Sequence, residues 1–398
     1  MHVVGNFSRI FCRRIPLDLL TSFVDMFPFH LIFGIFSVRY KNMRFPNGKR
    51  IFMVLLLAPV FLILLIVNRI FLLLDYLFAP QFLKKPIDSP VFIVGSPRSG
   101  TTFLFHSLAA KNDDFTCFKL WEIVFAPSIL QKKLVLIIRK FDRIIDSPLK
   151  RSMLFMEKLL LNKLKTIHPI GLNLPEEDEA ILLWDLSSLY FNFFYPEAHF
   201  FDELLLFDQK LSLQKRTRTM RRYRRYIQRH LYAFNPDGSK QFLSKNPMMM
   251  CKLETVKLLF PDALILNTNR CPGTVIPSTI ALNQALYGMF TSRKCSDEVN
   301  ERTKEILIAW YQMAHSALLK YETKLHIDFN KLVSRDEALQ LDISRIVQRD
   351  LGLFLKPIHD GSVAHKSKNR YEPMSENELH EVLSELPFLE KYCPNNQV

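Results

Sequence analysis

The spacing of apolar residues changes near residue 90. Upstream, residues 51–67 form an unbroken apolar run, and a second apolar stretch continues to residue 79. Downstream, strand-like segments at 91–94, 241–244 and 263–268 alternate with helical patterns, among them one that opens at residue 175 and one at 342–351. This alternation predicts parallel strands joined by helices, because parallel strands are buried on both faces. We therefore expect an α/β fold with a mostly parallel sheet, preceded by a hydrophobic N-terminal membrane segment.

The upstream region has the length and charge pattern of a membrane anchor. Its apolar run is at the lower limit for a span, and together the two stretches predict one transmembrane segment near residues 51–74. Eight Lys or Arg precede the run against two Asp, which favours a cytoplasmic N-terminus. Residues 27–38 are also apolar and could pair with the run as a hairpin, so the side of the membrane that holds the downstream domain stays open. A buried or interfacial helix is the alternative.

The most informative local pattern is a strand, a glycine loop and a helix. Residues 91–94 read VFIV, and an apolar helical pattern begins at residue 101. Between them, two glycines permit backbone angles that side chains disfavour, and the helix N-terminus directs backbone N–H groups at an anion. An arginine adds a charged planar fork. The candidate phosphate or sulfate loop comprises Gly95, Ser96, Pro97, Arg98, Ser99, Gly100, Thr101 and Thr102.

An ATP- or GTP-binding P-loop is the nearest competing interpretation. Its pattern has a lysine directly after the second glycine, but Thr101 occupies that position here. The sequence also offers no clear second aspartate for Mg²⁺ after a later strand. Both observations disfavour a kinase or NTPase, which is kept as an alternative function.

Three segments resemble sulfotransferases that use 3′-phosphoadenosine 5′-phosphosulfate (PAPS). PRSGTT resembles their 5′-phosphosulfate loop, and Arg270 with Ser278 eight positions later resembles their 3′-phosphate segment. PEEDE, residues 175–179, is similar to a motif of the bacterial-type branch. The resemblance covers roughly residues 90–391. It implies a P-loop-like three-layer domain with PAPS as co-substrate and no metal. The membrane segment lies outside the resemblance, so we divide the chain into an anchor region at 1–85 and a sulfotransferase domain at 86–398.

The resemblance also suggests catalytic residues. Lys245, in LSKNP, resembles a Lys-x-Pro element of the family, and as a cation it would stabilise charge on the leaving phosphate. Glu122 resembles the family's glutamate base, which takes a proton from the acceptor hydroxyl. The alternatives for the base are Glu177, Asp178, Glu179 and His168. A basic loop over the cofactor is implied as well, with Lys366 and Lys368 as candidate phosphate contacts.

The net charge and the composition indicate which classes of partner the chain can bind. The net charge of +14 suits an anionic cofactor, an anionic substrate or acidic membrane lipid. Residues 215–230 carry seven Arg and one Lys, and we favour a solvated or lipid-facing helix over nucleic-acid binding, because no recognised nucleic-acid module surrounds them. The six cysteines are scattered, so neither zinc nor a disulfide framework is indicated, and a reducing compartment is preferred.

The sequence thus predicts a membrane-associated PAPS-dependent sulfotransferase. Its acceptor bears a hydroxyl, but the sequence does not distinguish a lipid, a glycan and a small alcohol. An inactive membrane scaffold that keeps the fold is the second alternative. Nothing in the sequence indicates the oligomeric state.

Overall fold

The computed structural model describes residues 48–165, 170–292, 294–355 and 371–393. Its centre is a five-stranded sheet in the order β2-β3-β1-β4-β5, in which every neighbouring pair is parallel. The strands are β1 (Val91–Val94), β2 (Phe115–Thr116), β3 (Gln241–Lys245), β4 (Leu264–Asn269) and β5 (Lys324–Asp328). The parallel sheet confirms the predicted α/β class, and the three strands expected at 91–94, 241–244 and 263–268 all form.

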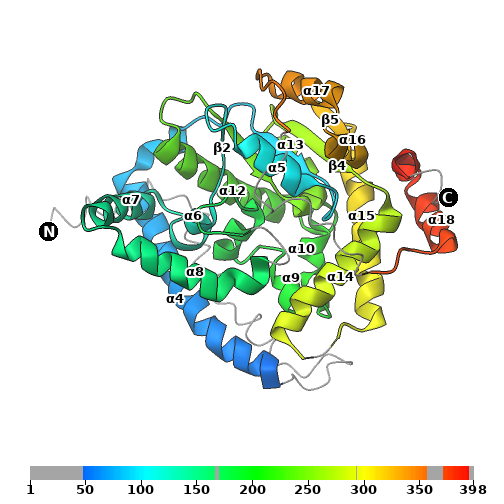
Figure 1. The fold of residues 1–398 in the computed structure, drawn as a ribbon, viewed down its shortest axis with the longest axis horizontal. Helices are drawn as coiled ribbons and strands as arrows, with labels where there is room; N and C mark the ends of the chain where they lie inside the picture. Colours follow the sequence, from blue (N-terminus) through cyan, green and yellow to red (C-terminus); the bar gives the residue numbers. More distant parts are fainter. Residues whose placement is uncertain (1–47, 166–169, 293, 356–370, 394–398) are drawn as a thin grey trace.

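Successive residues of β1 point to opposite faces of the sheet and join two separate cores. Phe92 and Val94 belong to the larger core, whereas Val91 and Ile93 belong to the smaller one. Side chains of α12 (Leu213–Phe234), α13 (Leu253–Leu259) and α15 (Asp297–Leu318) fill the first core, and those of α5 (Thr101–Ala109) and α17 (Glu337–Val347) fill the second. Helices on both faces of a parallel sheet give the predicted three-layer arrangement (Figure 1).

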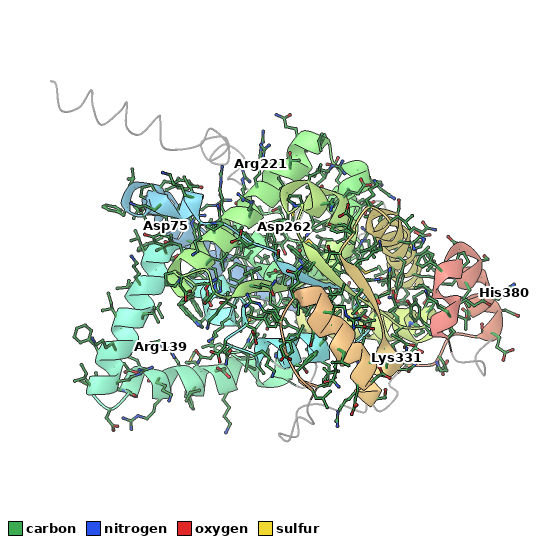
Figure 2. The ribbon with its side chains drawn as sticks, turned by 90° about the horizontal axis from the view of Figure 1, so that it is seen from above. Asp75, Arg139, Arg221, Asp262, Lys331 and His380 are labelled. Atoms are coloured by element: carbon green, nitrogen blue, oxygen red, sulfur yellow. A yellow bond between two sulfur atoms is a disulfide. The ribbon has the colours of Figure 1, made fainter. Side chains whose placement is uncertain are left out.

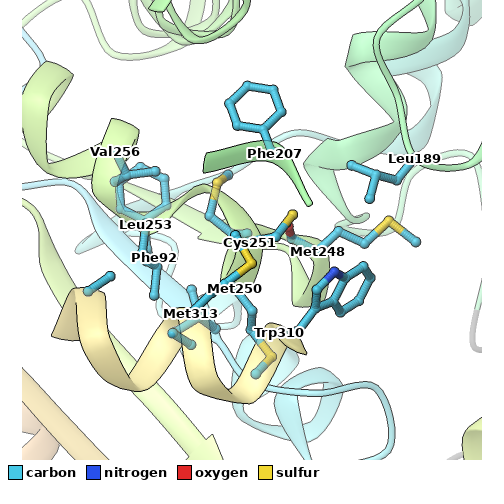
Figure 3. Close-up of a cluster of buried hydrophobic side chains, with 14 of the residues drawn as sticks. Phe92, Leu189, Phe207, Met248, Met250, Cys251, Leu253, Val256, Trp310 and Met313 are labelled. Carbon is cyan, nitrogen blue, oxygen red and sulfur yellow. The ribbon is translucent and has the colours of Figure 1, made fainter. Parts of the chain in front are cut away.

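The larger core is rich in sulfur and aromatic side chains. Met250 and Cys251 come from the 3₁₀ helix η4 (Pro247–Lys252), and they lie among Phe207, Trp310 and Met313 (Figure 3). Unbranched methionines fill irregular gaps in a core. Because η4 follows directly on β3, this packing fixes the end of that strand.

The remaining helices lie around this frame. They are α6 (Leu120–Phe125), α7 (Ile129–Ile144), α8 (Pro148–Lys165), η2 (Asp178–Asp185), α9 (Phe191–Phe194), α14 (Pro272–Phe290), α16 (Phe329–Ser334), α18 (Glu376–Glu385) and η5 (Pro387–Tyr392), with short turns at η1 (Pro80–Lys84), η3 (His199–Phe201), α10 (Asp202–Leu205) and α11 (Phe207–Lys210). Two expected helices differ in detail. PEEDE opens a 3₁₀ helix rather than an α-helix. The helix expected at 342–351 is α17, which begins earlier because the Asp336 side chain accepts a hydrogen bond from the Leu339 N–H and caps it.

The basic segment 215–230 lies within α12 and buries one of its faces. Met220, Tyr223, Ile227 and Leu231 recur every three or four residues and are buried in the larger core. Arg229 is buried too, in contrast to the predicted solvated or lipid-facing position of the basic residues. The difference arises because the Asp75 carboxylate accepts a hydrogen bond of 2.8 Å from Nε of Arg229 and so compensates the buried charge.

Helix α4 (Gly48–Phe78) holds both apolar stretches expected to form the membrane segment. Across the described ranges it is the one helix that is long and apolar enough to cross a membrane, a statement about length and composition only. Its C-terminal half packs against α6, α7 and η2. Figure 1 shows α4, α7 and α8 gathered at one side of the molecule, away from α17 and α18.

The prediction that the cysteines form no disulfide is wrong for one pair. Cys271, at the start of α14, is bonded to Cys393, at the end of η5. The two are 122 residues apart in sequence. Their spacing along the chain gave no sign of the pairing, because the fold alone brings the C-terminal segment to the end of β4.

Candidate active site

The C-terminal ends of β3, β1 and β4 lie side by side. Ile93 of β1 pairs with Lys245 of β3, and Val94 pairs with Asn267 of β4. The glycine loop, Lys245 and Arg270 therefore all emerge at one edge of the sheet. Ligands of open parallel sheets bind at this edge, so the structure brings three separate predicted segments together where a ligand is expected.

The glycine loop is held tightly against β4. Gly95 has a φ of +139°, and a Cβ at this position would lie 2.3 Å from Oγ1 of Thr268. Ser99 Oγ donates to the carbonyl oxygen of Ser96 (2.6 Å), and Ser96 Oγ lies 2.6 Å from the hydroxyl of Tyr311. Both serine side chains thus support the loop from inside. The first N–H groups of an α-helix have no partner within the helix, so the first turn of α5 offers donors to an anion.

Arg98, Arg270 and Ser278 meet beside this loop. Arg98 Nε donates to Ser278 Oγ at 3.0 Å, and the Arg270 guanidinium lies 4.1 Å from the centre of the Phe329 ring. Burial lowers the pKa of Arg270, and the positive charge of Arg98 acts in the same direction. No carboxylate of the described residues is among the groups that shift this pKa. An arginine held next to another cation, rather than next to an acid, is suited to bind a phosphate. The residues present therefore fit the phosphates of PAPS.

Lys245 is paired with one of the alternative candidates for the base. Its Nζ contacts Oε1 of Glu177, and Oε2 of Glu177 accepts a hydrogen bond of 2.8 Å from the Tyr190 hydroxyl. Burial and the charge of Glu177 raise the pKa of Tyr190 well above its ordinary value, so the phenol remains a donor. The side chain of Glu177 is 18 % exposed, against 2 % for Lys245. Glu177 is therefore the member of the pair that an incoming molecule can reach.

Glu122 lies in a different contact network. Its Oε2 is 2.8 Å from Nδ1 of His230 and 3.9 Å from Nζ of Lys132, and its Oε1 accepts from the Lys119 N–H. Burial opposes ionisation of this carboxyl, yet His230 and Lys132 lower its pKa below the ordinary value. Burial also lowers the pKa of Lys132, to about 8. Glu122 thus has both oxygens engaged, and its assignment as base stays a prediction.

The other acids of PEEDE face the interior. Asp178 accepts a hydrogen bond from Tyr223, and burial raises its pKa to about 7. Glu179 accepts from the Leu189 N–H and forms a buried ion pair of 2.5 Å with Lys252. Of the three alternatives in this motif, only Glu177 contacts Lys245 in the structure. Sequence position does not distinguish the three acids, because they are consecutive.

Three predicted residues cannot be placed. His168, Lys366 and Lys368 lie outside the described residues. In the described part of the chain, no group of three or more His, Cys, Asp or Glu side chains is arranged to hold a metal ion. The clamp of Arg98, Arg270 and Ser278 and the pair of Lys245 and Glu177 therefore define the candidate site.

Comparison with solved structures supports the fold. Sulfotransferase STF1 from Mycobacterium tuberculosis superposes with a TM-score of 0.61 at 19% identity, over 84% of this chain and 86% of that one. Sulfotransferase STF9 from Mycobacterium avium gives a TM-score of 0.56 at 14% identity, over 81% and 82%. At these identities the likeness concerns the fold alone.

Sequence comparison identifies the family. The chain is 28% identical over 208 residues to the omega-hydroxy-beta-dihydromenaquinone-9 sulfotransferases of Mycobacterium bovis and Mycobacterium tuberculosis. The match covers 50% of this chain and 46% of theirs, so it spans about half the length of these curated relatives. A model of the sulfotransferase family matches residues 90–343, which include the glycine loop, Lys245, Arg270 and Ser278. The chain belongs to the sulfotransferase family.

Proposed function

We propose that the chain transfers the sulfuryl group of PAPS to a hydroxyl group of an apolar, lipid-borne acceptor. The observation that carries this proposal is the meeting of two elements at one sheet edge: the clamp of Arg98, Arg270 and Ser278, and the pair of Lys245 and Glu177. The first suits a two-phosphate donor, and the second suits proton and charge transfer.

Arg98 and Arg270 would bind different phosphates of the sulfuryl donor, PAPS. The loop from Gly95 to Thr102 and the first turn of α5 would bind the 5′-phosphosulfate through backbone N–H groups and Arg98. Arg270 and Ser278 would hold the 3′-phosphate, a group that ATP lacks. Positioning and electrostatic stabilisation then supply most of the catalysis, as in phosphoryl transfer.

Glu177 is the proposed proton acceptor. As the acceptor oxygen attacks sulfur, its proton passes to the Glu177 carboxylate, a new S–O bond forms, and the bond from sulfur to the phosphate oxygen breaks. Lys245 and Arg98 stabilise the charge that develops on the departing phosphate. Glu122 is the second candidate for the base, but its side chain is 2% exposed, against 18% for Glu177.

The aromatic stretch after Glu177 supports an apolar acceptor. Tyr190 donates to Glu177, and the next residue, Phe191, lies edge-on to Phe61 of α4 at 6.1 Å. Two consecutive aromatic residues therefore link the proposed base to the apolar helix. The relatives named for a hydroxylated menaquinone derivative are consistent with a lipid acceptor.

The test is sulfuryl transfer from radiolabelled PAPS to farnesol in detergent micelles, with glucose as the soluble comparison. We expect labelled farnesyl sulfate with the wild type and about 100-fold less with Glu177→Gln. Transfer to glucose alone would contradict the lipid acceptor. Phosphate transfer from ATP would instead support a kinase. Unchanged biological function in a transfer-inactive Glu177→Gln protein would support the scaffold.

A further inference from the structure

The two ends of α4 are bound by charge to the same folded domain. Near its start, Nη1 of Arg50 lies 2.5 Å from Oε1 of Glu197, and the guanidinium also stacks on Tyr195. Near its end, Arg69 pairs with Asp185 at 3.2 Å. Asp185 ends η2 and Glu197 lies in the loop before η3, so both belong to the folded domain, which therefore lies along α4 rather than beyond one end of it.

The length between these ties is that of a membrane span. From Arg50 to Arg69 the helix rises by about 28 Å, at about 1.5 Å per residue. The hydrocarbon core of a bilayer is about 30 Å thick. A helix crossing the bilayer here would carry Glu197 and Asp185, with the domain surface between them, through the hydrocarbon. Buried ion pairs and domain loops at that depth are strongly unfavourable.

We infer that α4 does not cross the bilayer but lies along its surface, and that α4 together with the arm of α7 and α8 forms a side-on docking face for an anionic lipid membrane. This inference concerns how the chain binds a membrane and is independent of the reaction that it catalyses.

The outward face of α4 is apolar along its whole length. Phe52, Leu55 and Ile63 are each more than 60% exposed. The opposite face carries Arg50, Asn68 and Asp75, which are buried. The Asp75 carboxylate accepts hydrogen bonds from the N–H groups of Ile129 and Leu130 and so holds the first turn of α7. Residues 51–67 are apolar on all sides, as a span would also be, so the surface orientation of α4 rests on the ion pairs of Arg50 and Arg69 with the domain.

The arm continues this face with a second amphipathic helix. Beyond its first turn, α7 exposes Leu134, Ile137, Phe141 and Ile144 at spacings of four and three, with Phe141 64% and Ile144 73% exposed. In Figure 2 the helix that carries Arg139 leads away from the body, and α8 returns from its tip. An exposed apolar patch of this size on a folded domain indicates a binding surface for a partner or a membrane.

The charge of the arm identifies that partner or membrane as anionic. Apart from the buried Lys132 and Asp142, residues 129–158 carry seven Lys or Arg and two Asp or Glu. On α7, Lys140 lies beside the apolar stripe, and Arg143 and Arg139 lie further round the helix. Basic residues flanking an apolar stripe suit phospholipid headgroups above acyl chains. A protein that bound this surface instead would need an apolar centre surrounded by acidic side chains.

A labelling experiment separates lying along the membrane from crossing it. Gly48 and Gln81 flank α4 and are exposed, and a Cβ at Gly48 meets no atom within 4 Å. Gly48→Cys and Gln81→Cys proteins in sealed membrane vesicles are treated with an impermeant maleimide, with the wild type as the blank. We expect both cysteines to react from the same side. Reaction of one from outside and of the other only after detergent would overturn the inference.

A flotation experiment tests the arm. The full chain is floated with vesicles of phosphatidylcholine, with or without phosphatidylserine. Ile137→Asp/Phe141→Asp should reduce binding about tenfold or more, and Lys140→Glu/Arg143→Glu should remove most of the preference for phosphatidylserine. Leu341→Asp, on exposed α17, is the control and should bind normally. Normal binding by the arm variants, or loss of a dimer in light scattering when Ile137 and Phe141 are replaced, would overturn the assignment to lipid.

Discussion

The Nη1 atom of Arg270 donates a hydrogen bond of 3.0 Å to the carbonyl oxygen of Arg98, across 172 residues of sequence. One arginine follows β4 and the other lies in the loop after β1, and these strands are neighbours in the sheet. The contact therefore fixes the glycine loop relative to the end of β4. The two arginines are thus held beside each other, an arrangement that suits an anionic ligand.

Ser278 is expected to support this clamp through Arg98. Replacing Ser278 with alanine removes the 3.0 Å hydrogen bond and the proposed hydroxyl contact with the 3′-phosphate. Hydrogen bonds to charged groups contribute about 1.5–3 kcal/mol, so affinity for 3′-phosphoadenosine 5′-phosphate should fall about 10- to 100-fold in calorimetry. Ser334→Ala, on exposed α16, should bind like the wild type. Equal affinity of the two variants would show that Ser278 has no part in binding.

Gly95 is expected to tolerate no side chain. Its positive φ and the 2.3 Å approach of a Cβ to Thr268 should destabilise Gly95→Ala by about 1–3 kcal/mol. The displaced loop should also lose affinity for the nucleotide. Gly288→Ala is the matched control, because a Cβ there meets no atom within 4 Å and α14 should gain slightly in helix propensity. Urea unfolding of both proteins measures the difference, and equal midpoints would contradict the geometry.

Asp178 is expected to make stability depend on pH. Burial raises its folded-state pKa from 3.8 to about 7, so between these values the folded protein holds a proton that the unfolded chain has released. Stability should therefore decrease as the pH rises from about 4 to about 7 and then level off. Asp178→Asn should show a flatter profile in thermal unfolding over this range. An unchanged slope in the variant would mean that another group controls it.

The disulfide is expected to stabilise the nucleotide end of the fold. Cys271 follows Arg270 directly, and its bond to Cys393 holds η5 against the start of α14. Cys271→Ser/Cys393→Ser should lower stability by about 2–5 kcal/mol and increase proteolysis of the C-terminal segment. Cys117→Ser, at a buried thiol without a disulfide, controls for the loss of sulfur. Identical proteolysis patterns for the wild type and the double variant would argue against this role.

The sequence predicts the donor side better than the acceptor side. The loop after β1 was recognisable because its signal is local: four apolar residues, two glycines and a helix start. The pairing of Lys245 with Glu177 depends on how a segment 68 residues earlier returns to the sheet, and consecutive acids give no sign of which one faces the site. Burial of α12 was predictable in part, since Met220, Tyr223, Ile227 and Leu231 already have helical spacing among the arginines.

The most direct test of the account is calorimetry with 3′-phosphoadenosine 5′-phosphate and with ATP, on the wild type and Arg270→Ala. The account predicts that the wild type binds the 3′-phosphorylated nucleotide much more tightly than ATP. Arg270→Ala should lose about 100-fold of that affinity, whereas Arg345→Ala, on exposed α17, should lose none. Equal binding of both nucleotides by the wild type, or unchanged binding by Arg270→Ala, would contradict the assignment of this site to PAPS.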